Sequence, residues 1–290
     1  MEKFVRLMRL KHWIKNLFVF IPVFYHGNIF EADTVLKQMP AFLLFGMTAS
    51  AVYILNDLKD REDDKKHPEK RKRPIASGEI SPTAAALFAA FLVILTGVSA
   101  YFVSVKLALV LLIYFLMNIL YSLQLKKFPI VDLAVISTGF ILRLFAGSAT
   151  AEIALSPWLL VTVFLLTFLL ALNKRREEVH LNVTAKVLTR ESVKGYTLQF
   201  IDSLTVVLVS AIIVVYMLYS ISASGTRAGY LADYYYITSF WVVLGLAKYL
   251  QLIYANPEKT DPTNMIYRDK HLAIIVLIWF FSTLLILYWK

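Results

Sequence analysis

The sequence predicts an all-α protein, a polytopic membrane bundle of about nine transmembrane helices. Of its 290 residues, 59% are hydrophobic and only 17% are charged, and the mean hydropathy is +0.65. The apolar residues lie in runs of roughly 20, the length that crosses a bilayer as a helix. Most Lys and Arg residues lie between these runs. A soluble domain of this size has no core that buries so much apolar surface, so lipid is the expected solvent.

Nine apolar runs follow one another along the chain. The first, near 14–30, is the least regular, because Lys15, Asn16, Pro22 and His26 interrupt it. The other eight are continuous enough to predict one spanning helix each, near 36–57, 83–104, 107–124, 131–151, 156–173, 197–221, 234–254 and 271–289. The chain is therefore expected to be a single transmembrane domain over residues 1–290.

The basic residues predict the orientation of the chain. Five segments hold 24 of the 30 Lys and Arg residues, and these are 1–15, 58–82, 125–130, 174–196 and 255–270. Basic loops stay on the cytoplasmic side, which predicts a multi-pass protein of the inner or plasma membrane with its N-terminus inside and its C-terminus outside. The net charge of +10 follows from these loops, so no nucleic-acid partner is expected. The absence of cysteine excludes disulfides and thiolate chemistry.

An acidic motif continues the second run. Asn56 is followed by Asp57, Asp60 and Asp64, and the i, i+3, i+7 spacing of the acids places them in one stripe on a helix. Carboxylate and amide oxygens are ligands for Mg²⁺, or Mn²⁺, rather than zinc. Magnesium held by few carboxylates completes its shell with water and phosphate oxygens, so the motif favours a phosphorylated substrate. The alternative interpretation is a solvated acidic helix end.

A basic run follows the acids within the loop 58–82. Lys70, Arg71, Lys72 and Arg73 are consecutive, and a loop of this length is able to fold back over the acidic motif. Arginine binds phosphate through two parallel hydrogen bonds, and lysine acts as a point charge. The alternative is a plain positive-inside signal or a contact with lipid headgroups.

Several polar residues fall inside or at the ends of predicted spans. Arg143 is costly within a bilayer unless it faces a wet cavity and a partner, and Asp132 lies on the same helix face about 16 Å away. Tyr121 continues a polar stripe that points toward Lys126. Both observations indicate a cavity that binds substrate. The alternatives are a buried arginine that holds the bundle together, and interhelical hydrogen bonds with interfacial tyrosines.

The motif N-D-x-x-D-x-x-x-D, matched by Asn56 to Asp64, resembles the UbiA superfamily of intramembrane prenyltransferases. The resemblance implies a helical bundle that binds Mg²⁺ and a diphosphate at this motif. At the place of the family's second acidic motif this chain reads Asn173-Lys174-Arg175-Arg176-Glu177-Glu178. This basic segment is similar to the branch containing decaprenyl-phosphate phosphoribosyltransferases. Two further segments are similar to this branch: residues Arg9 to Asn16, and the run from Tyr121 through Lys126 and Asp132 to Gly147.

The resemblance implies transfer of phosphoribose from phosphoribosyl diphosphate to a polyprenyl phosphate. Asp57, Asp60 and Asp64 would hold the metal-bound diphosphate, with Lys15, Arg71 and Arg73 adding positive charge. Lys174 and Arg175, with Lys126 or Arg143, would hold the acceptor phosphate, and Asp132 would orient the ribose or tune the nucleophile. The matched motifs add Asn16, Tyr121 and Glu178 to the binding residues. Ordinary helix ion pairs between Lys174 or Arg175 and Glu178 are the alternative.

Two other functions are open at this point. A conventional prenyltransferase would place a prenyl diphosphate at the acidic motif and use an aromatic acceptor, but the basic segment 173–178 disfavours it. A transporter would use the intramembrane charges as a transport path, and would leave the acidic stripe unexplained. The sequence does not indicate the polyprenyl length or the oligomeric state.

Overall fold

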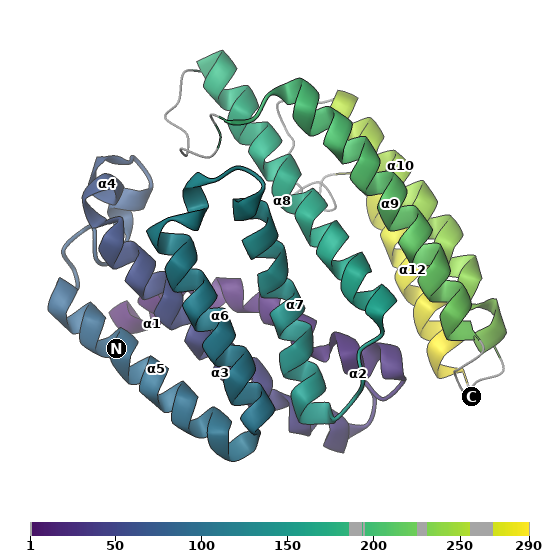
Figure 1. The fold of residues 1–290 in the computed structure, drawn as a ribbon, viewed down its shortest axis with the longest axis horizontal. Coiled ribbons are helices and arrows are strands. Elements are labelled where there is room, and N and C mark those ends of the chain that lie inside the picture. The colour runs from purple at the N-terminus through teal and green to yellow at the C-terminus, as the bar shows by residue number, and fades with distance from the viewer. Residues whose placement is uncertain (1, 186–192, 194, 225–230, 256–268, 290) are drawn as a thin grey trace. The chain divides into compact units, whose positions relative to one another are not determined.

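The computed structural model describes residues 2–185, 193, 195–224, 231–255 and 269–289, and that part of the chain is helical without any β-strand (Figure 1). Eight helices are long and apolar enough to cross a membrane. They are α3 (Ala32–Lys59), α5 (Pro82–Val103), α6 (Val105–Leu123), α7 (Val131–Ala151), α8 (Pro157–Ala185), α9 (Leu198–Ser224), α10 (Thr238–Ala255, preceded by the 3₁₀ helix η5, Ala232–Ile237) and α12 (Lys270–Tyr288). They confirm eight of the nine predicted spans.

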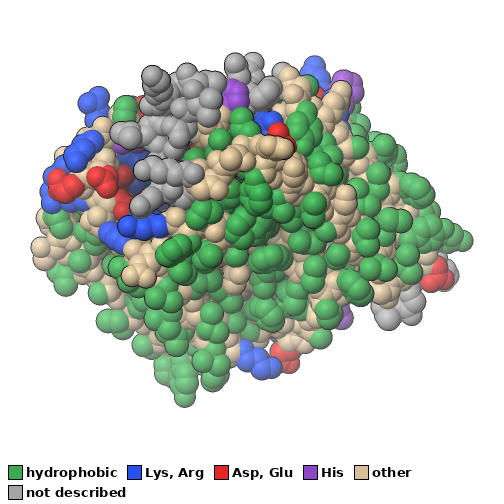
Figure 2. All heavy atoms as spheres, turned by 45° about the horizontal axis from the view of Figure 1, so that its top comes forward, with side chains coloured by type: hydrophobic (Ala, Val, Ile, Leu, Met, Phe, Trp, Pro, Cys, Tyr) green, Lys and Arg blue, Asp and Glu red, His purple; other side chains and the backbone are tan. Residues whose placement is uncertain are grey.

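The outer face of these helices is apolar. On α5 the side chains of Leu87, Ile94 and Phe102 are 67%, 66% and 80% exposed. Figure 2 shows hydrophobic side chains over most of the visible surface, and a group of charged side chains where α4 (Arg61–Lys66) lies. So much exposed apolar surface is stable only against lipid, and the chain is a multi-pass membrane protein.

The contacts divide the chain into two compact units, with α7 continuous from one into the other. Unit 1 comprises residues 1–123 and 139–155, and unit 2 comprises 124–138 and 156–290. In unit 1, α3 packs against α5 and α6. Its largest cluster gathers Val19, Phe45, Leu107, Leu111 and Leu142 with their neighbours. The prediction of a single transmembrane domain stays a prediction.

The first predicted span, 14–30, is not one continuous α-helix. After α1 (Glu2–Met8) the chain forms a 3₁₀ helix, η1 (Leu10–Phe20), and then the short helix α2 (Ile21–His26), which ends at Gly27 with φ 89°. Pro22 lies at the start of α2 and supplies no backbone donor. This segment packs within unit 1, since Asn16 and Val19 are buried.

Gly147 allows η1 to approach α7 closely. A methyl group at this position would overlap with the carbonyl oxygen of Val19, and the Gly147 carbonyl accepts a hydrogen bond from Gln38 Nε2 at 3.1 Å. Because Gly147 has no side chain, the backbone of η1 can pack directly against α7.

Replacing Gly147 by Ala is expected to destabilise the protein by at least about 2 kcal/mol, because backbone atoms have to move. Gly97→Ala on α5 is the matched control, since no atom lies within 4 Å of the added methyl group, and it should stabilise by roughly 0.5 kcal/mol. Thermal unfolding in detergent measures both. Equal effects of the two substitutions would contradict the account of Gly147.

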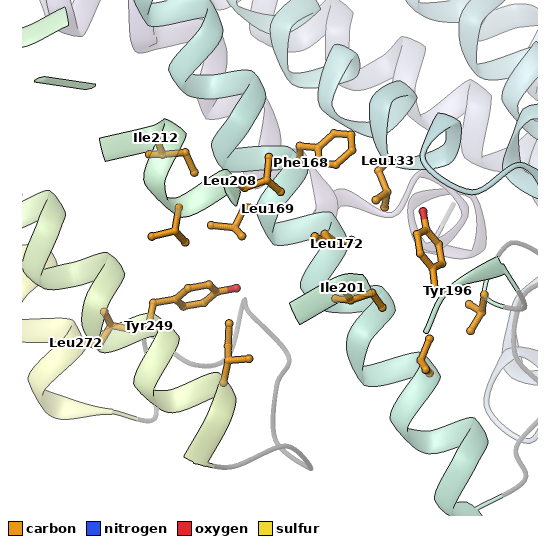
Figure 3. Close-up of a cluster of buried hydrophobic side chains, with 14 residues drawn as sticks. Leu133, Phe168, Leu169, Leu172, Tyr196, Ile201, Leu208, Ile212, Tyr249 and Leu272 are labelled. Carbon is orange, nitrogen blue, oxygen red and sulfur yellow. The ribbon is translucent and has the colours of Figure 1, made fainter. Parts of the chain in front are cut away.

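Unit 2 is built mainly from α8 packed on α9, and from α10 packed on α12. Its core cluster includes Leu133, Leu169, Leu172, Ile201 and Ile253, each with no exposed surface, and Figure 3 shows several of these side chains pointing toward one another. Helix α8 runs to Ala185, so residues 174–185 are helical where a loop 174–196 was predicted. Of that loop, residues 186–192 and 194 lie outside the described residues.

Candidate active site

The acidic motif lies at the junction of two helices in unit 1. Helix α3 ends at Lys59, Asp60 has φ −89° and ψ 9°, and α4 begins at Arg61. The predicted single helical stripe is therefore interrupted at Asp60. The Asp60 and Asp64 amides still donate to the carbonyls of Asn56 and Asp60, each at 2.9 Å. Because the helical path nearly continues, Asp57 and Asp64 point to the same side, and each is buried, at 3% and 2% exposure.

Two arginines neutralise these carboxylates. Arg73 Nη1 lies 3.0 Å from Asp57 Oδ1 and 2.6 Å from Asp64 Oδ2. Arg9 Nη2 donates to both oxygens of Asp57, at 2.5 and 2.7 Å, and its guanidinium lies over the ring of Tyr53. Arg9 has φ 53°, a left-handed backbone that costs a residue with a Cβ atom about 1 kcal/mol. The residue with this strained backbone is therefore the one whose side chain binds Asp57.

The loop that carries Arg73 is anchored by apolar side chains. Ile75 and Ile80 are 1% and 5% exposed, and they pack with Leu7 and Ile54 in one cluster of unit 1. The predicted return of the loop toward the acids is therefore confirmed for Arg73. Arg71, two residues earlier, is exposed to solvent.

The end of α6 is tied to the acidic motif. Ser122 Oγ donates to Asn56 Oδ1 at 3.2 Å, and the ammonium of Lys59 donates to the backbone carbonyls of Ser122 and Leu123. A lysine at these carbonyls satisfies the unpaired acceptors of a helix C-terminus. These contacts fix the position of the Asn56 side chain relative to α6.

Arg143 and Asn16, both predicted to bind substrate, meet in unit 1. Arg143 Nε donates to Asn16 Oδ1 at 2.9 Å, and Nη1 donates to the Gly139 carbonyl at 2.7 Å. The guanidinium is 4% exposed and lies over three aromatic rings, the nearest being Phe45 at 4.5 Å. Within the described residues no carboxylate pairs with Arg143, and Asn16 Nδ2 is buried without a hydrogen-bond partner. This part of unit 1 thus holds a buried guanidinium without a carboxylate partner among the described residues, and a buried amide donor without an acceptor.

Asp132 and Arg175 form a buried ion pair in unit 2. Arg175 Nε donates to Asp132 Oδ2 at 2.9 Å, and Arg175 Nη1 donates to Glu178 Oε1 at 2.8 Å. Asp132 is 0% exposed and Arg175 is 2% exposed. This differs from the expectation that Arg175 holds a substrate phosphate directly, because its guanidinium already binds two carboxylates. The predicted helix pair between Arg175 and Glu178 is present.

Tyr196 completes this cluster. Its hydroxyl donates to Asp132 Oδ1 at 3.2 Å and accepts from the Ile130 amide at 2.6 Å. Burial, together with the negative charge of Asp132, raises the pKa of Tyr196 to about 12. The phenol therefore keeps its proton at neutral pH and remains a hydrogen-bond donor to Asp132.

Four other predicted site residues differ in their exposure to solvent. Lys15 and Lys174 are exposed, whereas Tyr121 and Lys126 are half-buried. Arg9, Ser122 and Tyr196 contact predicted site residues although they were not predicted to belong to the site. Arg9 and Ser122 carried a signal, since Arg9 opens the N-terminal segment that supplied Lys15 and Asn16, and Ser122 lies in the run from Tyr121 through Lys126. Tyr196 carried none.

The acidic motif fits a divalent cation by the chemistry of its donors. Asn56, Asp57, Asp60 and Asp64 supply oxygen atoms only, as Mg²⁺ and Mn²⁺ prefer. Asp57 and Asp64 already converge on one positively charged group, Arg73. No three acidic or histidine side chains are gathered as a ligand set in the described ranges, and Arg73 binds the two buried carboxylates there.

Comparisons with known proteins find relatives along nearly the whole chain. The chain is 30% identical to "Decaprenyl-phosphate phosphoribosyltransferase" of Mycolicibacterium smegmatis, over 95% of this chain and 89% of the relative. It is also 30% identical to the protein of the same name from Corynebacterium glutamicum, over 98% and 86% of the two chains. A UbiA homologue of Archaeoglobus fulgidus, solved with DMAPP and Mg²⁺, has the same fold, with a TM-score of 0.69 at 17% identity over 98% of this chain and 99% of that one. Residues 30–274 match the UbiA prenyltransferase family, to which this chain therefore belongs.

Proposed function

We propose that this protein transfers 5-phosphoribose from phosphoribosyl diphosphate to a polyprenyl phosphate of the decaprenyl type, and releases diphosphate. The similarity to decaprenyl-phosphate phosphoribosyltransferases along 95% of the chain carries the proposal. The charge pattern supports it, since the acidic motif lies in unit 1, whereas Lys174 on α8 of unit 2 is an exposed base.

The donor binds at the acidic motif in this proposal. Asn56, Asp57, Asp60 and Asp64 hold Mg²⁺, with Mn²⁺ as a substitute. When bound, the metal neutralises the diphosphate and stabilises the charge that develops as it leaves. Arg71, Arg73 and Lys15 add positive charge toward the same phosphates.

The acceptor is a lipid phosphate that is already an anion at neutral pH. An oxygen of this phosphate forms a bond to C1 of the ribose while the bond from C1 to the diphosphate oxygen breaks, so no strong base is required. We assign Lys174 and Lys126, both in unit 2, to direct positive charge on the acceptor, and Tyr121 remains a predicted substrate-binding residue. Because Asp132, Arg175 and Glu178 bind one another, we assign them a positioning role in α7 and α8.

Arg143 and Asn16 provide a further anion-binding group in unit 1. The guanidinium and the unpartnered Asn16 Nδ2 are both donors, and both are buried. A substrate phosphate or ribose oxygen would supply the missing acceptor, since an unsatisfied buried donor costs about 1–3 kcal/mol.

The proposed orientation places these groups on the cytoplasmic side, with the N-terminus inside and the C-terminus outside. The basic segments 58–82 and 174–196 support it, because soluble phosphoribosyl diphosphate has to reach the acidic motif. Accessibility of single introduced cysteines in intact cells tests the orientation. A cysteine at position 68 should react only after permeabilisation.

Transfer is tested with purified protein in detergent, polyprenyl phosphate, Mg²⁺ and phosphoribosyl diphosphate labelled in the ribose. The expected result is label in the lipid that requires both Mg²⁺ and the lipid phosphate. A parallel reaction offers a labelled prenyl diphosphate and an aromatic acceptor. Transfer in that reaction alone would establish a conventional prenyltransferase and overturn the proposal.

A further inference from the structure

Arg73 is shared between the two buried carboxylates of the acidic motif. A single nitrogen, Nη1, lies within hydrogen-bond distance of Asp57 on α3 and of Asp64 on α4. The two acids come from different helices, so the guanidinium joins them across the junction at Asp60. Both carboxylates therefore face the same positively charged group.

The charges of this cluster already balance. Asp57 and Asp64 contribute two negative charges, and Arg9 and Arg73 contribute two positive charges. A divalent cation added to these four groups, with Asp60 as the third acid of the proposed ligand set, would leave one excess positive charge beside carboxylates that are only 2–3% exposed, which is costly at low dielectric. One arginine therefore has to leave when a cation binds.

The contacts identify Arg73 as the arginine that leaves. Arg9 binds both oxygens of Asp57 and also stacks on Tyr53. Arg73 contacts only one oxygen of each acid, and its side chain is 27% exposed, against 22% for Arg9. Its release therefore needs only a rotation of an accessible side chain, whereas release of Arg9 would break a paired hydrogen bond and a ring contact.

We infer that Arg73 competes with the divalent cation for Asp57 and Asp64, and binds the diphosphate once the cation has displaced it. The inference rests on the proposed function, and adds that metal and diphosphate bind as a pair. Metal alone has to displace the guanidinium without giving it a new partner. The metal–diphosphate complex offers Arg73 a phosphate in exchange for the lost carboxylates.

The competition predicts opposite effects of one substitution. In Arg73→Gln, Mn²⁺ alone should bind about tenfold tighter, because the competing charge-assisted hydrogen bonds are gone. The preformed complex of Mn²⁺ with inorganic diphosphate should bind about tenfold weaker, because its arginine partner is gone. Equilibrium dialysis of the full-length protein in detergent, with radioactive manganese, measures both affinities. A purely structural role for Arg73 would weaken both.

Lys72→Gln is the matched control, since it removes one positive charge from the same loop at a side chain that pairs only with Glu69 in the described structure. Its two affinities should stay within about twofold of the wild type. A gain in Mn²⁺ affinity as large as that of Arg73→Gln would reduce the effect to general charge and overturn the inference. So would unchanged or weaker Mn²⁺ binding by Arg73→Gln.

The wild-type protein provides a test that does not depend on the folding of a variant. It should bind the manganese–diphosphate complex at least about tenfold tighter than Mn²⁺ alone. Equal affinities would contradict paired binding. Neither measurement uses phosphoribosyl transfer, so the inference and the proposed function fail separately. If phosphoribose is transferred but Arg73→Gln does not show the opposite changes in the two affinities, the inference alone is rejected. If these changes are seen but no phosphoribose is transferred, the proposed reaction alone is rejected.

Discussion

Replacing Asp57 by Asn is expected to lower the rate of phosphoribosyl transfer about 100- to 1000-fold. Asp57 is the acid that contacts both arginines of the motif, and it is a proposed metal ligand. The amide keeps the shape of the side chain but carries no charge, so the electrostatic stabilisation of the departing diphosphate falls by several kcal/mol. Initial rates with labelled phosphoribosyl diphosphate at saturating Mg²⁺ measure the loss.

The matched control for this substitution is Asp63→Asn. Asp63 is an exposed acid of the same motif region, on α4 beside Asp64, so the same change of charge is made outside the buried cluster. Its rate should stay within about twofold of the wild type. Similar losses in both variants would show that the total negative charge of this region matters rather than Asp57 itself.

Replacing Arg175 by Met is expected to destabilise the protein by about 3–5 kcal/mol. The substitution removes from the fully buried Asp132 the guanidinium that binds it at 2.9 Å, and breaking a buried ion pair by removing one partner carries that cost. Unfolding of the detergent-solubilised protein measures the change. Lys174→Met, at the neighbouring exposed position, should change stability by less than about 0.5 kcal/mol.

The double variant Asp132→Asn, Arg175→Met isolates the interaction. Removing both charges should recover a large part of the stability lost by Arg175→Met, because the fully buried charge of Asp132 is then gone and only Glu178, which is 21% exposed, has lost Arg175. Additive losses in the double variant would contradict a direct pair between the two residues. Recovered stability without recovered transfer would instead support a positioning role for the pair in catalysis.

The transmembrane helices could be predicted because hydropathy is a property of each segment by itself. Eight apolar runs became eight helices. The first run did not, since Asn16 and Val19 pack against other parts of unit 1 and the chain forms η1 there. Its path depends on Gly147, more than 100 residues away, and a local pattern carries no information about that contact.

The candidate site could be predicted where its residues are neighbours in sequence. The spacing of Asp57 and Asp64 brought both acids to one side, and the basic run that follows contains Arg73. The partner of Asp132 could not be predicted in this way. Helical spacing relates Asp132 to Arg143 on its own helix, but the structure pairs it with Arg175, which lies 43 residues away on α8. Pairing between helices depends on packing that spacing does not encode.

The position of the label after one turnover tests the central claim most directly. Phosphoribosyl diphosphate is labelled in two samples, one at the 5-phosphate and one at the terminal phosphate of the diphosphate, and each is incubated with the protein, Mg²⁺ and polyprenyl phosphate. Transfer of phosphoribose predicts that the 5-phosphate label enters the lipid and that the other label appears as inorganic diphosphate. Terminal-phosphate label in the lipid, or no label in the lipid from either sample, would contradict the claim.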